Sequence, residues 1–339
     1  MNPALQALIT ILVGVGGCVG YFYLSNLFLD KVLFPARGKN AGRNINRANI
    51  IRPWLFLLPA LLALGTYLAY PVYETLRLSL TERSTLPDGT TAYAWAGLDN
   101  YRQMLNEPKF WEALKNNAMW LAVVPALATG FGLLAAQLTD RLKWGNIAKS
   151  LIFMPMAISF VGAAVIFKLV YDMRPIEQEQ IGILNALYLN FGGEAPIAWL
   201  TLPFWNNFFL MAVLVWIQTG FAMVILSAAL RGIPEETIEA AIVDGANPFQ
   251  VFFKIKVPQI KGTIMVVWTT ITIVVLKVFD IVFAMTNGQW GTQVLANYMY
   301  DKLFRANDWG VGSASAMVIM LLVTPILVWN VRNARREMK

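Results

Sequence analysis

Seven apolar stretches, each of about 20 residues, divide this chain and restrict its fold more than any other feature. A bilayer core roughly 30 Å thick needs about 20 predominantly apolar residues for each helix that crosses it. Because backbone amides in lipid must be satisfied within the segment, such runs separated by polar loops favour a helical bundle. The sequence therefore predicts an all-α polytopic membrane protein, with spans at Ala4–Leu24, Trp54–Val72, Ala118–Leu138, Leu151–Tyr171, Phe208–Leu230, Ile264–Thr286 and Ala314–Val331.

Composition supports a lipid environment and excludes several kinds of site. Hydrophobic residues make up 57% of the chain and charged residues only 14%, outside the usual balance of a soluble domain. There is one cysteine, Cys18, and no histidine, so disulfide frameworks and histidine metal sites are excluded and no metal site is predicted. The first span has no basic residue before it and no Ala-x-Ala site after it, and we expect it to be retained.

The formal charge of +7 is explained by basic residues that alternate between loops, as in a membrane protein, and so this charge does not require a nucleic-acid partner. Loops assigned to one side carry about twice as many lysines and arginines as loops on the other, and the basic-rich side is cytoplasmic. An odd number of spans puts the N-terminus outside and the C-terminus inside, beside lipid head groups of a bacterial inner membrane. The basic-rich side holds Lys31, Arg37, Lys39, Arg43, Arg47, Arg52, Arg141, Lys143, Lys149, Arg231, Lys254, Lys256, Lys261, Arg332, Arg335, Arg336 and Lys339.

The first span looks separate from the six that follow. A linker rich in Arg, Lys, Asn and Gly sets it apart, which predicts an extra helix with a basic cytoplasmic linker over 1–53 and a six-helix domain over 54–339. Gly16 and Gly20 form a G-x-x-x-G pair, which either packs closely on a neighbouring helix or is ordinary glycine content of a span.

The cytoplasmic loop at about 231–262 is long and carries helix signals, so we predict that it is structured. Pro234 lies at a helix start, Glu235 and Glu236 favour the positive N-terminal end, and Gly245 ends the helix. Apolar residues after the glycine turn, among them Phe249 and two further phenylalanines, give a second amphipathic segment. The alternative to a docking surface is an inert structured loop.

This loop resembles the EAA motif of permeases of ATP-binding-cassette (ABC) importers. The match is Glu239-Ala240-Ala241, three residues, Gly245, nine residues, then Ile255, one residue, and Val257-Pro258, with valine where leucine is usual. In that family the short helix docks in a groove of the ATP-binding subunit. It transmits the movements of the nucleotide cycle to the membrane spans. The resemblance therefore implies coupling roles for Glu239, Ala240, Ala241, Asp244, Gly245 and Pro258.

Other segments resemble permeases of the maltose and glycerol-phosphate type. Trp95-Ala96-Gly97-Leu98-Asp99-Asn100-Tyr101 is similar to their first outside loop, and Gln289-Trp290 departs from the glycine and proline that many relatives have there. The extra N-terminal span before Arg52-Pro53-Trp54 is similar to alpha-glucoside permeases. The resemblance implies a six-helix type I core, an ABC ATPase dimer, a second permease, an extracytoplasmic solute-binding protein and a carbohydrate substrate.

Polar residues inside spans are costly and usually face an interior or a water-filled cavity. Lys277 and Asp280 are three residues apart, which predicts that they share one helical face in the outer half of the membrane. They either line a sugar path or form an internal ion pair or strut. The residues predicted to bind substrate are Gln218, Thr219, Phe221, Thr270, Lys277 and Asp280.

The chain has no G-x-x-x-x-G-K-[ST] motif, so no ATP is expected on it and the energy must come from a partner subunit. No catalytic constellation is visible, which argues against an enzyme. An ion-coupled secondary transporter is the main alternative, but Asp280 is the only central acid in the spans. Such a transporter would not need a docking helix for an ATPase.

Overall fold

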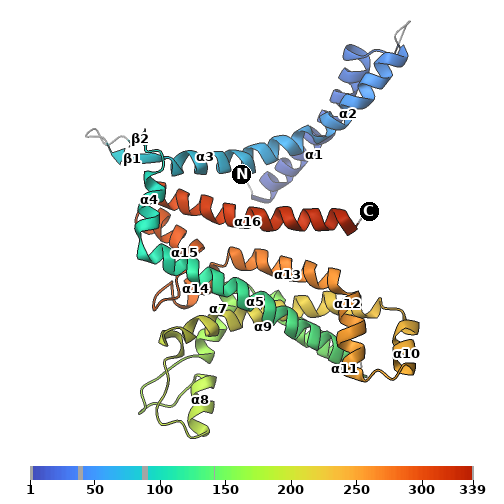
Figure 1. Ribbon diagram of the computed structural model, residues 1–339. Helices are drawn as coiled ribbons and strands as arrows, with labels where there is room; N and C mark the ends of the chain where they lie inside the picture. Colours follow the sequence, from blue (N-terminus) through green and yellow to red (C-terminus); the bar gives the residue numbers. More distant parts are fainter. Residues whose placement is uncertain (1–2, 37–40, 86–90, 141, 338–339) are drawn as a thin grey trace. The chain divides into compact units, whose positions relative to one another are not determined.

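The computed structural model describes residues 3–36, 41–85, 91–140 and 142–337, and it divides into two compact units, Met1–Glu74 and Thr75–Lys339 (Figure 1). The domain boundary predicted after residue 53 stays a prediction. Of the basic residues counted above, Arg37, Lys39, Arg141 and Lys339 lie outside the described residues.

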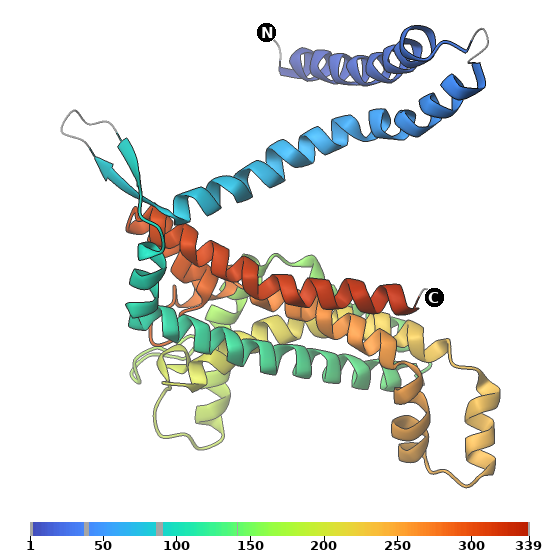
Figure 2. The same cartoon turned by 45° about the horizontal axis from the view of Figure 1, so that its top comes forward.

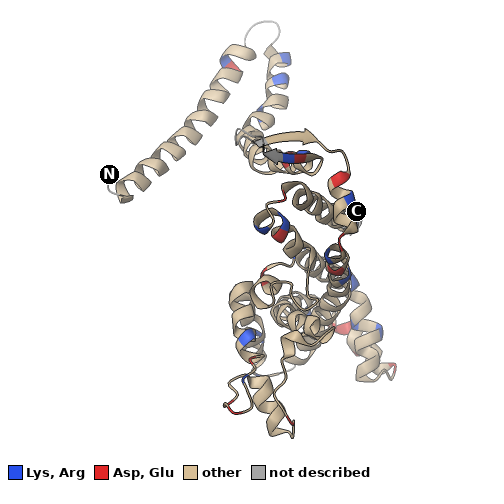
Figure 3. Cartoon of the chain, turned by 90° about the vertical axis from the view of Figure 1, so that its left-hand side faces the viewer, with Lys and Arg blue, Asp and Glu red and all other residues tan. Residues whose placement is uncertain are grey.

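The first unit consists of helices that follow one another along the chain, and it ends at Glu74, within the last of them. α1 (Pro3–Phe28) ends in a π-helical turn, and α2 (Ala41–Leu64) runs through a second π-helical turn into α3 (Tyr70–Ser79). Arg52 of α2 reaches back to the end of α1, donating to Asp30 at 2.7 Å and to Asn26 at 3.0 Å. In Figure 3 the charged residues of this unit gather near the loop between the helices, and the rest of α1 is uncharged. Added Cβ atoms on Gly16 and Gly20 would meet nothing within 4 Å among the described atoms.

The second unit is a bundle of helices with one short hairpin. Its strands β1 (Thr81–Thr85) and β2 (Thr91–Trp95) pair antiparallel, with Thr81 opposite Trp95. The helices are α4 (Asp99–Asn106), α5 (Pro108–Thr139), α6 (Gly145–Phe153), α7 (Phe160–Val170), α8 (Ile183–Asn190), α9 (Trp205–Arg231), α10 (Glu235–Val243), α11 (Pro248–Gln250), α12 (Val257–Gln259), α13 (Lys261–Leu276), α14 (Asp280–Met285), α15 (Leu295–Tyr300) and α16 (Trp309–Glu337).

The core of this unit forms where α5 and α13 pack along α9 (Figure 2). Trp120, Leu214 and Ile271 are fully or almost fully buried there. Gly132 lets α5 approach α9 closely, because a Cβ at that position would lie 2.4 Å from the Cβ of Ala222. In lipid, close packing of these apolar side chains stabilises the association of the helices.

The predicted all-α membrane fold is confirmed, although the spans are less regular than expected. Five helices in the described part of the chain are long and apolar enough to cross a membrane, and the number is up to seven if each of two bent helix pairs is one span. The hairpin is the only sheet among the described residues.

Two predicted spans are not continuous helices, and this corrects the prediction. The span expected over Leu151–Tyr171 bends by 104° between α6 and α7. The span expected over Ile264–Thr286 stops at Leu276 and resumes at Asp280. The short pieces are supported by packing, since α14 lies against α7, and Lys168 of α7 donates to the carbonyl of Ala284 at 3.4 Å.

The connections of the second unit fall into two groups at opposite ends of the bundle. The hairpin, α4, α8 and α15 lie at one end, whereas α10, α11 and the end of α16 lie at the other (Figures 1 and 2). This grouping agrees with the two sets of loops assigned from the sequence.

Candidate translocation site and coupling segment

The first helix break lies between α6 and α7. Met154–Ala157 forms a 3-10 turn with Pro155 near its start, where the missing proline N–H costs no hydrogen bond. Ser159 then caps α7, and its hydroxyl accepts a hydrogen bond from the backbone N–H of Gly162 at 3.1 Å. The chain thus changes direction at this point, and the Ser159 side chain satisfies one backbone N–H in the first turn of α7.

The second break, over Lys277, Val278 and Phe279, contains neither proline nor glycine. The N–H of Val278 still donates to the carbonyl of Val275 at 3.1 Å, and Phe279 has non-helical dihedral angles of −138° and −59°. Irregular backbone at membrane depth is tolerated where it is buried in protein or lines a cavity.

Two adjoining cavities lie at these breaks, and Phe160 and Asp280 line both of them. The larger cavity, of about 380 Å³, is also lined by Ser159 and by Gln218 of α9. The smaller, of about 300 Å³, is also lined by Lys277 among other residues. An acid, an amide, a hydroxyl and an aromatic ring therefore meet between α7, α9 and α14, a mixture of groups typical of a small-molecule site.

The structure brings together three of the six predicted substrate residues, Gln218, Lys277 and Asp280. The prediction that Lys277 and Asp280 share one helical face is wrong, because α13 ends before Lys277 and α14 begins at Asp280. No ion pair joins these two among the described side chains, and Lys277 is exposed.

The other three predicted residues do not line these cavities. Thr219 donates to the carbonyl of Val215 at 2.7 Å and lines a separate apolar groove of about 640 Å³ between α5, α6 and α9. Phe221 packs against the core, and Thr270 donates to the carbonyl of Val266 at 2.8 Å. Thr219 and Phe221 follow Gln218 on α9, but the turn of the helix directs them elsewhere.

Sequence reasoning missed Ser159 and Phe160, which line the cavity beside Asp280. The available signal was Pro155, which lies inside an apolar stretch four residues before a serine suited to cap a helix. Phe279 lines the smaller cavity, and its ring stacks on Phe283 with a centroid distance of 5.0 Å.

The segment between α9 and α13 forms an arm at the opposite end of the bundle from the hairpin (Figure 2). Its first part, α10, contains Glu239 and Ala240, both exposed, and Ala241, which is buried. Its second part comprises α11, a π-helical stretch and α12, in which Pro258 is exposed at the start of α12. α10 packs against the π-helical stretch.

The turn between the two parts depends on Gly245. Its φ is +84°, a left-handed conformation that L side chains rarely adopt. The N–H of Gly245 donates to the carbonyl of Ile242, and the N–H of Ala246 donates to that of Ala241, both at 3.0 Å, which satisfies the end of α10. Asn247 and Gln250 then form a capping box that starts α11.

Large apolar side chains are exposed around this turn. Val243 is 86% exposed and Phe249 is 76% exposed, and Ile242 and Phe253 are also mostly exposed. Asp244 is exposed beside them. An apolar, exposed tip held by a capped turn is a surface suited to a protein partner.

Comparison with known proteins identifies the class. A family model described as "Binding-protein-dependent transport system inner membrane component" matches residues 128–338. The alpha-glucoside transport system permease protein AglF of Rhizobium meliloti is 62% identical over 99% of both chains. The osmoprotective compounds uptake permease protein GgtC of Synechocystis is 45% identical, over 84% of this chain and 99% of that protein.

The fold agrees with a solved importer. The crystal structure of a bacterial ABC transporter involved in the import of the acidic polysaccharide alginate contains a chain with a TM-score of 0.72 to this one. That chain is 20% identical and the match covers 89% of this chain and all of that one.

The chain therefore belongs to the family of inner membrane components of binding-protein-dependent transport systems. It is a multi-pass ABC importer permease, as the EAA motif implies, and this decides against the ion-coupled secondary transporter.

Proposed function

We propose that this chain is one permease subunit of an ATP-driven importer of α-glucosides. The cavity between the two helix breaks carries the proposal, because it joins an aromatic ring to hydrogen-bonding groups, as sugar recognition requires. The choice of α-glucosides rests on the relative named alpha-glucoside permease, which is 62% identical to this chain.

In this proposal the substrate contacts Gln218 and Asp280, with Ser159 and Lys277 at the edges of the same space. A carboxylate can accept two hydrogen bonds from neighbouring sugar hydroxyls, and an amide can both donate and accept. Thr219, Phe221 and Thr270 are not part of the proposed site.

The arm containing α10 is the proposed contact with an ABC ATPase dimer, which binds the ATP. Its exposed tip, with Val243 and Phe249, would enter a groove of that partner, and Glu239 would pair with a basic group beside it. The small side chain of Ala240 would let α10 approach closely, and Pro258 would begin the return to α13.

The end of the bundle that carries α10 is then cytoplasmic, as is the end of α16, and the hairpin end faces outward to receive a solute-binding protein. The proposal keeps the N-terminus outside. One such chain supplies half of a path, so a second, related permease completes it.

Uptake of radiolabelled maltose, an α-glucoside, tests both the substrate class and the site. In cells lacking the native chain, a copy restored on a plasmid should take up maltose, and unlabelled trehalose should compete while lactose should not. Loss of a hydrogen bond to a charged group costs about 1.5–3 kcal/mol, so Asp280→Asn should raise the half-saturation concentration by about tenfold or more.

Gln218→Ala should act in the same direction, and Thr219→Ala is the matched control because its hydroxyl is satisfied within α9 and faces another groove. Normal maltose affinity in both site variants would overturn the assignment of this cavity. Competition by lactose alone would overturn the substrate class.

A further inference from the structure

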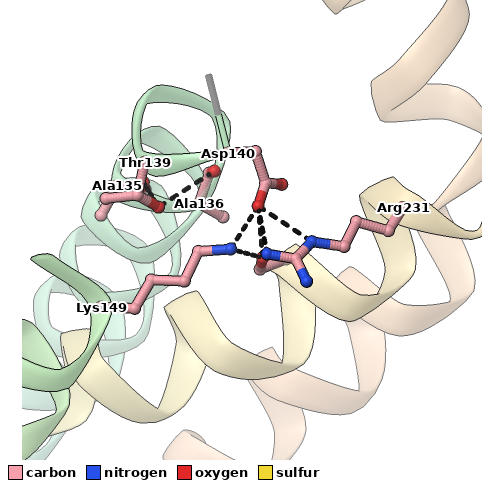
Figure 4. Close-up of polar contacts among 7 residues, drawn as sticks. Ala135, Ala136, Thr139, Asp140, Lys149 and Arg231 are labelled. Carbon is pink, nitrogen blue, oxygen red and sulfur yellow. Dashed lines mark hydrogen bonds and ion pairs between the residues drawn. The ribbon is translucent and has the colours of Figure 1, made fainter. Parts of the chain in front are cut away.

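A cluster of polar side chains joins three helices near the base of the arm (Figure 4). Asp140, directly after α5, accepts hydrogen bonds from Lys149 of α6 and from Ser227 and Arg231 of α9. The distances to its Oδ1 are 3.0 Å from the Ser227 hydroxyl and 3.1 and 3.0 Å from two guanidinium nitrogens of Arg231. Lys149 also donates to Ser227 at 2.6 Å.

One carboxylate oxygen therefore holds three helices in place. The side chains of Lys149 and Asp140 are only 14% and 20% exposed, whereas that of Arg231 is 60% exposed. Burial of Asp140 opposes its charge, but the hydrogen bonds from Lys149, Arg231 and Ser227 outweigh it and hold the pKa of the carboxyl below its ordinary value. A partly buried carboxylate with several donors is costly to leave without them.

The three helices lead to functionally different places. Arg231 is the last residue of α9, and the chain enters α10 only four residues later. Lys149 lies in α6, which runs into the break at Met154–Ala157, where Met156 lines the larger cavity. The return of the arm also touches α5, because Lys256 donates to Gln137 at 3.4 Å.

We propose that Asp140 is a positioning residue that carries movement of the arm, through Arg231 and Lys149, to the broken span lining the cavity. This inference rests on the proposed coupling role of α10. When α10 is displaced, Arg231 moves with the end of α9, and Asp140 links that displacement to Lys149 in the middle of α6. Short helices of this kind move as rigid pieces, so α6 shifts the cavity wall at its far end.

The proposal separates ATP hydrolysis from transport, and the purified complex reconstituted into sealed proteoliposomes allows both to be measured. Asp140→Ala should leave assembly with the ATPase and basal ATP hydrolysis within about twofold of wild type, because neither α10 nor its tip is altered. Maltose uptake and stimulation of hydrolysis by the loaded binding protein should each fall by about tenfold or more, as expected when a buried charge network is broken.

Two single variants test the two ion pairs of Asp140 separately. Arg231→Gln breaks the connection to the arm and Lys149→Met the connection to α6, so each should uncouple hydrolysis from uptake as Asp140→Ala does. Combining either with Asp140→Ala should add little, since all three act through one contact. Asp140→Glu should restore part of the coupling by returning the charge.

Thr139→Val is the matched control, because Thr139 is the neighbouring residue and its hydroxyl donates within α5 to Ala135 and does not join the cluster. Normal coupling in Asp140→Ala would overturn the proposal, and so would a parallel loss of assembly, hydrolysis and uptake in all cluster variants. Absence of maltose uptake in wild type would instead count against the proposed substrate, and stimulation of hydrolysis would still test the cluster.

Discussion

Gly245 permits a sharp test of the arm, because an alanine there changes the preferred backbone conformation without a clash inside this chain. An added Cβ would meet nothing within 4 Å, so Gly245→Ala creates no clash. The φ of +84° is nevertheless unfavourable for an L residue, and left-handed conformations cost roughly 1–2 kcal/mol. A cost of this size changes an equilibrium by a factor of about 5–30.

If the partner ATPase recognises the turned form of the arm, that factor is the largest loss of affinity that Gly245→Ala can cause. The assay is the concentration of ATPase subunit needed to restore ATP hydrolysis to permease complexes stripped of it. We expect an increase of up to about 5–30-fold, with insertion and thermal stability of the bundle unchanged, since the arm projects from the core.

Gly245→Asn is the matched control, because asparagine adopts the left-handed conformation more readily than alanine and also carries a Cβ. It should retain most of the affinity. Equal impairment of the alanine and asparagine variants would refute the conformational argument and indicate that any side chain at this position blocks the partner. No change in either variant would show that the turn is not recognised.

Two further predictions concern packing and charge. Gly132→Ala should destabilise the bundle by about 1–3 kcal/mol through overpacking against Ala222, measured by thermal unfolding, while Gly130→Ala, which meets nothing within 4 Å, should not; equal melting temperatures would contradict the close approach of α5 and α9. The pKa of Asp140 lies below its ordinary value of 3.8. The stabilisation that the charged carboxylate gives to the cluster is therefore fully present above pH 3.8 and is lost as the pH falls through the lowered pKa. Coupling of hydrolysis to uptake should therefore be flat from about pH 6 to about pH 8, and a midpoint within that range would assign the titration to another group.

Most of the architecture could be predicted from apolar length and loop polarity. Span length follows from bilayer thickness, so α5, α9 and α16 were expected close to where they occur. The short helix and turn at Gly245 were also predictable, because glycine and the flanking acids act locally. These features depend on neighbouring residues in the sequence and need no knowledge of tertiary packing.

The helix breaks were not predictable in the same way. Pro125 and Pro325 lie inside continuous helices, whereas Pro155 marks a break, so proline alone does not distinguish the cases. The break at 277–279 has neither proline nor glycine and contains Val278 and Phe279, residues compatible with a buried helix. It is supported by tertiary contacts between α14 and α7, which the sequence pattern does not record.

The same limit explains why only half of the residues predicted to bind substrate line the two cavities. Gln218, Thr219 and Phe221 were predicted together because the span that contains them lines the cavity in the family that this chain resembles, but on α9 these residues point to a cavity, an apolar groove and the core in turn. Only packing of the broken spans against α9 selects Gln218. A site built from two interrupted helices can change shape when either piece moves, and α6 is the piece that also reaches the base of the arm through Lys149. The discontinuity that defeats prediction from sequence is thus the feature that would let a cytoplasmic movement open or close the cavity.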